Sequence, residues 1–150
     1  MEQTKRAVEV YQASEVCARC KGMCCKKYSG CYSPEDFGEV TYEKLRTDMK
    51  KGLLAIDWWE ADPPEYFVRP RHVNEPVVCG SWGGVCVNLT EEGCRLSWND
   101  RPLGCKALKP MENAQDYCRS DYLKEDSKND WKQYDGILRR LVEEYRNGEL

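Results

Sequence analysis

The sequence CARCKGMCC, residues 17–25, places four of the chain's ten cysteines within nine residues. Cys17 and Cys20 have the C-x2-C spacing that lets two thiols turn their sulfurs toward one point, as in zinc and iron-sulfur sites. On a helix Cys24 would share the face of these two residues, whereas Cys25 would point about 100° away. Packing alone gives no reason to repeat one residue type at ligand spacing, so the cluster predicts a metal centre.

Composition indicates the number of domains, the kinds of partner and the cellular compartment. With 150 residues and no charge-biased half, the chain predicts a single domain over 1–150. Charged residues make up 33% and the formal net charge is -3, with acids and bases interspersed, so we expect neither nucleic acid nor a membrane as a partner. No apolar stretch resembles a signal peptide or could span a bilayer, which predicts a cytoplasmic protein.

Cytoplasmic thiols are kept reduced, so a dense cysteine pattern there favours metal binding over disulfides. The adjacent pair Cys24 and Cys25 supports this interpretation. Their Cα atoms are about 3.8 Å apart across a trans peptide, which is shorter than the roughly 4.4 Å that an unstrained disulfide needs.

The first half of the chain predicts helices separated by turns. Apolar spacing predicts a helix over 4–16, and Ser33 followed by proline and two acids predicts a helix start. A further helix is expected over 41–51, ending at Gly52. The stretch 53–78 carries prolines and short β-branched or aromatic runs, which indicate turns and one small antiparallel β pair.

The second half combines loops with one clear helix. Residues 79–110 show no long period and are expected to be loops that something other than an apolar core holds in place. A C-terminal amphipathic helix is expected over about 128–147, with Gly148 as its stop, because apolar residues recur there at steps of three and four: Trp131, Tyr134, Ile137, Leu138, Leu141, Val142 and Tyr145. The predicted fold class is therefore mainly α with long irregular loops and a small antiparallel β pair, one compact domain organised around a Cys-ligated metal centre whose core is about 17–118.

A second cysteine group lies in GVCVNLTEEGCRLSWNDRPLGCKALKP, residues 84–110. CARCKGMCC, the C-x7-C spacing of Cys86 and Cys94, and the GC-x6-RP-x2-C pattern that ends at Cys105 together resemble the YkgJ-like, or CxxCxxCC, family of zinc- or iron-chelating domain proteins. The chain departs from the family pattern at one place. Three residues, 21–23, stand where the pattern has two, which leaves the separate roles of Cys24 and Cys25 open.

The resemblance implies a set of metal- and cofactor-binding residues: Cys17, Cys20, Cys24, Cys25, Cys86, Cys94 and Cys105. Three cysteines outside the pattern are candidates for extra ligands of a second centre: Cys31, Cys79 and Cys118. The family is often described as iron-sulfur or oxidoreductase without a defined reaction.

Both an iron-sulfur cluster and zinc fit a thiolate set, and the thiolate count favours the cluster because one zinc needs only four ligands. His72, the single histidine, is expected to be exposed or packed rather than ligating. Trp82 and Trp98 are expected either to shield a cluster from water or to pack as ordinary core aromatics. Arg101 is expected to donate to sulfur or to a carbonyl, or else to lie solvated in a surface turn.

The predicted function is a cysteine-ligated iron-sulfur protein, [4Fe-4S] with one or two clusters, that acts in electron transfer or redox chemistry with an unidentified redox partner protein. The alternative is a zinc-binding structural or interaction module. A third hypothesis is that the protein is a catalyst, which acts by thiol-disulfide exchange at Cys17 and Cys20 or by cluster chemistry. No hydrolase or transferase motif is present, because the glycine-rich CGSWGG at 79–84 matches no nucleotide-binding pattern and the acids Glu60, Asp62 and Glu65 nominate no general base.

Overall fold

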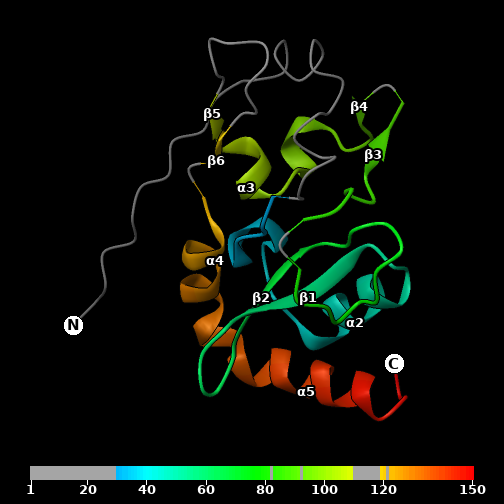
Figure 1. Cartoon of the computed structure of the whole chain (residues 1–150), viewed down its shortest axis with the longest axis vertical. Coiled ribbons are helices and arrows are strands. Elements are labelled where there is room, and N and C mark those ends of the chain that lie inside the picture. The colour runs from blue at the N-terminus through cyan, green and yellow to red at the C-terminus, as the bar shows by residue number, and fades with distance from the viewer. Residues whose placement is uncertain (1–29, 82, 92, 110–118, 121) are drawn as a thin grey trace, which may run out of the picture.

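A computed structural model describes residues 30–81, 83–91, 93–109, 119–120 and 122–150 (Figure 1). The helix expected over 4–16 and the first cysteine cluster lie outside these residues. The described part contains four α-helices, three two-stranded antiparallel sheets and three short 3-10 helices. The α-helices and strands are α2 (Tyr42–Lys50), β1 (Leu54–Trp59), β2 (Glu65–Pro70), β3 (Leu89–Thr90), β4 (Gly93–Cys94), α3 (Leu103–Lys106), β5 (Leu108–Lys109), β6 (Arg119–Ser120), α4 (Lys124–Trp131) and α5 (Asp135–Arg146).

The β1–β2 hairpin is the centre of the molecule and confirms the predicted antiparallel pair. Its register runs from Leu54 opposite Pro70 to Trp59 opposite Glu65. Both outer edges of the hairpin are covered. The backbone N–H of Tyr32 donates to Val68 O at 2.9 Å along β2, and the extended segment 77–79 bonds to Ile56 along β1.

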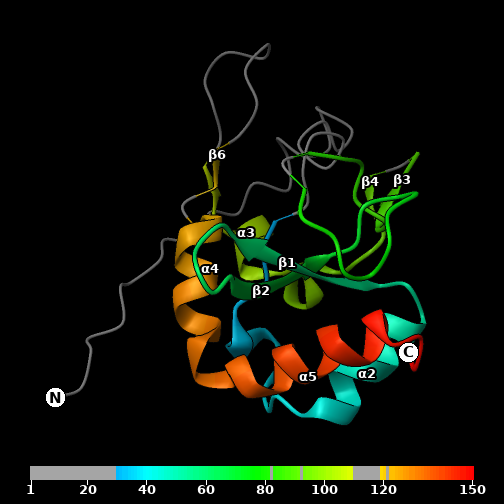
Figure 2. The ribbon, with the colours of Figure 1, turned by 60° about the horizontal axis from the view of Figure 1, so that its bottom comes forward.

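The hairpin separates two parts of the molecule. Helices α2 and α5 lie on one side, and α3 with the β3–β4 hairpin lies on the other (Figure 2). Helix α4 packs against both strands of the hairpin. The main apolar core lies around the hairpin and the helices, with Ile56, Phe67, Trp131 and Leu138 among its fully buried side chains.

Local sequence signals explain the first helices. Ser33 caps the 3-10 helix Pro34–Phe37 with a capping box, so the predicted helix start is confirmed as a short 3-10 element. Thr41 caps α2 through its hydroxyl, which accepts the N–H of Lys44. Gly52 has φ of +73°, a conformation that glycine adopts without steric cost, and the chain turns there into β1.

The C-terminal region forms two helices where one was expected over 128–147. Helix α4 begins earlier, because Asp126 accepts the backbone N–H of Leu123 at 2.9 Å and so caps the helix start. A 3-10 turn over Lys132–Tyr134 then separates α4 from α5, which runs in a different direction (Figure 1). The expectation of one continuous helix was wrong because α4 follows the hairpin while α5 turns to cover β2 and α2.

Residues 79–110 are largely irregular, as expected, but contain short elements that the sequence did not indicate. They are β3, β4, α3, β5 and the 3-10 helix Trp98–Asp100. The described part therefore agrees with the predicted class in its helices, its long irregular loops and its small antiparallel pair, and it adds two further pairs of two-residue strands. Among the described residues, no helix combines the length and the apolar character that crossing a bilayer requires.

Candidate metal centre

Three of the seven predicted ligands, Cys86, Cys94 and Cys105, lie in the described part of the chain. The other four are Cys17, Cys20, Cys24 and Cys25, and these lie outside it, as does the candidate Cys118. The described cysteines carry thiols and are not joined in disulfides. Cys94 belongs to β4 and Cys105 to α3, two elements that lie above the β1–β2 hairpin in Figure 1.

Cys86 is held by the backbone on both sides. Val73 N–H donates to Val85 O at 2.7 Å, and Val87 N–H donates to Arg71 O at 2.9 Å, so Cys86 lies opposite His72 in an antiparallel bridge. Its side chain is 3% exposed, and burial raises the pKa of the thiol to about 11. The N–H of Asn88 points at the sulfur at 3.5 Å, a contact that stabilises a thiolate and lowers its pKa.

The β3–β4 hairpin turns the chain so that Cys94 lies near Cys86. Cys94 pairs with Leu89, whose N–H donates to Cys86 O at 3.1 Å. The two thiols are close enough that the charge of a Cys94 thiolate raises the pKa of Cys86. Arg95 closes the hairpin by donating to the Asn88 side chain at 2.9 Å. The C-x7-C spacing is thus the length of a hairpin that brings its two thiols together.

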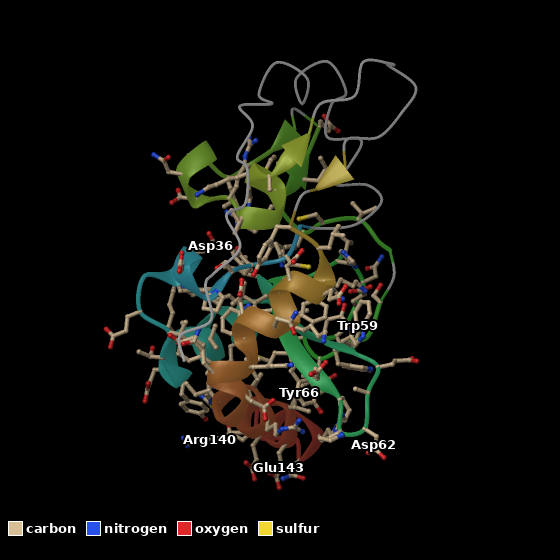
Figure 3. The ribbon with its side chains drawn as sticks, turned by 90° about the vertical axis from the view of Figure 1, so that its left-hand side faces the viewer. Asp36, Trp59, Asp62, Tyr66, Arg140 and Glu143 are labelled. Atoms are coloured by element: carbon tan, nitrogen blue, oxygen red, sulfur yellow. The ribbon has the colours of Figure 1, made fainter. Side chains whose placement is uncertain are left out.

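Cys105 is placed by contacts to both sides of α3. Asp36, labelled in Figure 3, accepts the N–H of Leu103 at 2.8 Å and so caps the start of this helix. Gly104 N–H donates to Cys31 O at 2.9 Å. A Cβ atom built on Gly30 would lie 2.7 Å from the Cys105 sulfur, so only glycine fits at position 30. Backbone-to-backbone contact at Gly30 and Gly104 therefore fixes the third thiol.

The Tyr32 phenol lies near two of the described thiols. Burial raises its pKa most, and thiolate charges at Cys105 and Cys86 raise it further, so both cysteines lie within electrostatic range of the phenol. Within the described residues, no three Cys, His, Asp or Glu side chains are close enough together to hold a metal ion by themselves. A thiolate centre takes four sulfurs, and Cys86, Cys94 and Cys105 supply at most three of them. As soft donors, the three thiolates fit part of a zinc or iron-sulfur ligand set.

The two other described cysteines have different surroundings. Cys31 belongs to the apolar core and is 2% exposed. Cys79 is half-buried, its N–H donates to Ile56 O at 3.1 Å, and burial raises the pKa of its thiol. The role of either residue as an extra ligand stays a prediction.

The accessory residues named from the sequence also have defined positions. His72 is fully buried with its Nδ1 atom 3.1 Å from Glu75 Oε1, which confirms that it packs; burial lowers its pKa. Arg101 Nε donates to Leu96 O at 3.2 Å, so the expected bond to a carbonyl is confirmed. The side chains of Trp82 and Trp98 lie outside what the structure describes. Asp62 lies at the β1–β2 turn, far from α3, as Figure 3 shows.

Sequence reasoning missed a buried charged cluster around Arg69, with Asp57 and Glu75 as its acidic partners. It considered the exposed acids Glu60 and Asp62 instead. A signal was present, because Asp57 and Arg69 each interrupt an otherwise apolar strand run. Opposite charges inside two pairing strands indicate a buried ion pair.

The described part is a small domain in which Cys86, Cys94 and Cys105 lie in the bridge, the strand and the short helix beyond the β1–β2 hairpin. Comparison with protein families then places the chain. The model of the CxxCxxCC family, described as "Putative zinc- or iron-chelating domain", matches residues 16–133, and the protein belongs to this family. No curated protein and no solved structure matches the chain.

Proposed function

We propose that the protein is a cysteine-ligated iron-sulfur protein of the [4Fe-4S] type that acts in electron transfer or redox chemistry. The observation that carries this proposal is that Cys86 lies within electrostatic range of Cys94, and Tyr32 within range of both Cys86 and Cys105, in a chain of a family described by metal chelation. When bound, a cluster would supply one-electron redox chemistry.

Sequence separation supports a centre shared with the first cysteine cluster. Gly30 lies against Cys105, and Cys25 precedes Gly30 by five residues. Five residues extend at most about 18 Å, which sets an upper limit on the distance from Gly30 to Cys25 and permits a centre shared with Cys105. Seven thiols exceed the four that one zinc ion requires, and this excess favours a cluster over zinc.

The surroundings of the described thiols suit a buried anionic centre. Cys86 is excluded from water, and the Asn88 N–H directed at its sulfur would stabilise its thiolate form. Hydrogen bonds to sulfur and exclusion of solvent both tune the potential of a thiolate-bound centre.

The test is metal analysis of protein purified without oxygen. We expect brown protein with iron and acid-labile sulfide and a broad visible absorption that bleaches on reduction. Cys94→Ser and Cys105→Ser should each lose most of the metal, whereas Cys118→Ser should lose less. Colourless protein with stoichiometric zinc would replace this function with the zinc module, and full iron retention in both serine variants would show that the ligand set is wrong.

A further inference from the structure

The buried guanidinium of Arg69 links the hairpin to the segment that carries Cys86. Its side chain is fully buried and donates from Nε to Asp57 Oδ2 at 2.9 Å and from Nη2 to Glu75 Oε2 at 3.1 Å. Charges buried this deeply are tolerated only when they are paired and hydrogen-bonded. Removing Arg69 would leave two carboxylates without the cation between them.

Arg69 also fixes backbone outside the hairpin. Its Nη2 atom donates to Cys79 O at 3.3 Å, which holds the extended segment beside β1. Lys124 of α4 adds a second cation, 3.6 Å from Asp57 Oδ2, and donates to Ser81 O. The irregular chain between β2 and β3 is therefore ordered by cations bound to its carbonyls, because it has few apolar side chains to bury.

From Glu75 the contacts continue to Cys86. The second oxygen of Glu75 lies 3.1 Å from His72 Nδ1, and the His72 ring supports the backbone of Gly84. A Cβ at Gly84 would lie only 2.7 Å from Nδ1, so the backbone at position 84 lies directly on the ring. Cys86 follows two residues later, in the bridge to His72.

We propose that Arg69 is a positioning residue for the cysteine centre: by binding Glu75 and the Cys79 carbonyl, it orders the segment that leads to Cys86 and holds that thiol in place. The metal-binding role of Cys86 rests on the function proposed above. The positioning of Cys86 can be measured without it.

The experiment is alkylation of the full-length protein as purified, in the absence of oxygen, with N-ethylmaleimide and peptide mapping by mass spectrometry. Arg69→Met should raise the labelling rate of Cys86 about tenfold relative to Cys31, because the backbone of Cys31 is fixed by the hydrogen bond from Gly104 N–H to its carbonyl, which this substitution leaves in place. Glu75→Gln should give a smaller rise at the same cysteine, and it serves as the test if Arg69→Met does not fold. The control is Leu138→Ala, which removes core packing on α5 and should raise labelling of both cysteines by one common factor.

Metal release to a chelator is followed on the same samples by the visible spectrum. Selective labelling of Cys86 with faster release in Arg69→Met supports the proposal. Equal labelling of Cys86 and Cys31, or no change at either, would overturn it and leave Arg69 as a residue for general stability. Wild-type protein without bound metal would reject the function proposed above, while the labelling ratio would still decide the role of Arg69.

Discussion

Gly104 provides a direct test of how Cys105 is held. A Cβ atom at this position would lie 2.4 Å from Cys31 N, 2.9 Å from Cys31 O and 2.9 Å from Gly30 C. All three are backbone atoms, which cannot rotate away as a flexible side chain can. Gly104→Ala must therefore push α3 off the 30–31 segment and break the bond from Gly104 N–H to Cys31 O.

The cost can be worked out from two contributions. Overpacking a tight contact costs about 1–3 kcal/mol, and a lost hydrogen bond costs about 1 kcal/mol. Together they predict that Gly104→Ala lowers the free energy of unfolding by about 2–4 kcal/mol, a large share of the 5–15 kcal/mol typical of a domain. Because Cys105 is the next residue, bound metal should fall as well.

Urea unfolding followed by circular dichroism measures the change, with Gly136→Ala as the matched control. Gly136 lies within α5 and a Cβ there meets nothing within 4 Å, so alanine should raise stability by about 0.5–1 kcal/mol. Ordinary surface substitutions change the free energy of unfolding by up to about 0.5 kcal/mol. A value for Gly104→Ala within that range of wild type would refute the argument that backbone contact at Gly104 holds Cys105.

Two further predictions concern the scaffold. Hydrogen bonding from Lys128 lowers the pKa of Glu65, so this contact stabilises the fold above pH 4.5 and is lost as the pH falls. Glu65→Gln should therefore lower the melting temperature measured by calorimetry at pH 7, whereas near pH 3 the melting temperatures of the variant and the wild type should converge. Trp131→Phe removes the indole N–H that donates to Tyr32 O at 2.9 Å in the core, while Ser127 Oγ still donates to the same carbonyl at 2.8 Å. Loss of the indole bond should therefore lower the free energy of unfolding by about 0.5–1.5 kcal/mol and shift the urea midpoint; an unchanged midpoint would show that this bond contributes nothing.

The parts of the fold that local chemistry dictates could be predicted from the sequence. Ser33, Thr41 and Gly52 act on the backbone beside them, so their signals survive in the folded chain. The apolar stripe at the C-terminus predicted the buried face correctly. It missed the turn at Lys132–Tyr134, because the same spacing of apolar residues continues across the break.

Features that depend on contacts between distant residues could not be predicted. The pairing of Arg69 with Asp57 follows from the register of β1 and β2, which sets Arg69 opposite Ala55, two residues from Asp57. Cysteine spacing correctly indicated the zinc- or iron-chelating family, but the position of Cys105 depends on contact between Gly30 and Gly104, which lie far apart in the sequence. Gly30 lies outside the ligand pattern and Gly104 occupies one of its variable positions, so nothing in the spacing points to either.

The cysteine-bearing part is held differently from the rest of the molecule. In the described stretch 83–109, the apolar residues that become buried are few, with Cys86 and Ala107 the ones that belong to the buried apolar set. Order there comes from backbone bonds to Arg71, Val73 and Cys31 and from charged side chains such as Arg95. Hydrogen bonds of this kind contribute about 1 kcal/mol each, whereas thiolate binding of a metal contributes on the order of ten. Metal binding of the kind proposed above would therefore be the largest single term that stabilises this part. Its folding and its loading with metal would then form one coupled equilibrium, and we propose that Gly30, Gly104 and Arg69 set the geometry of the site.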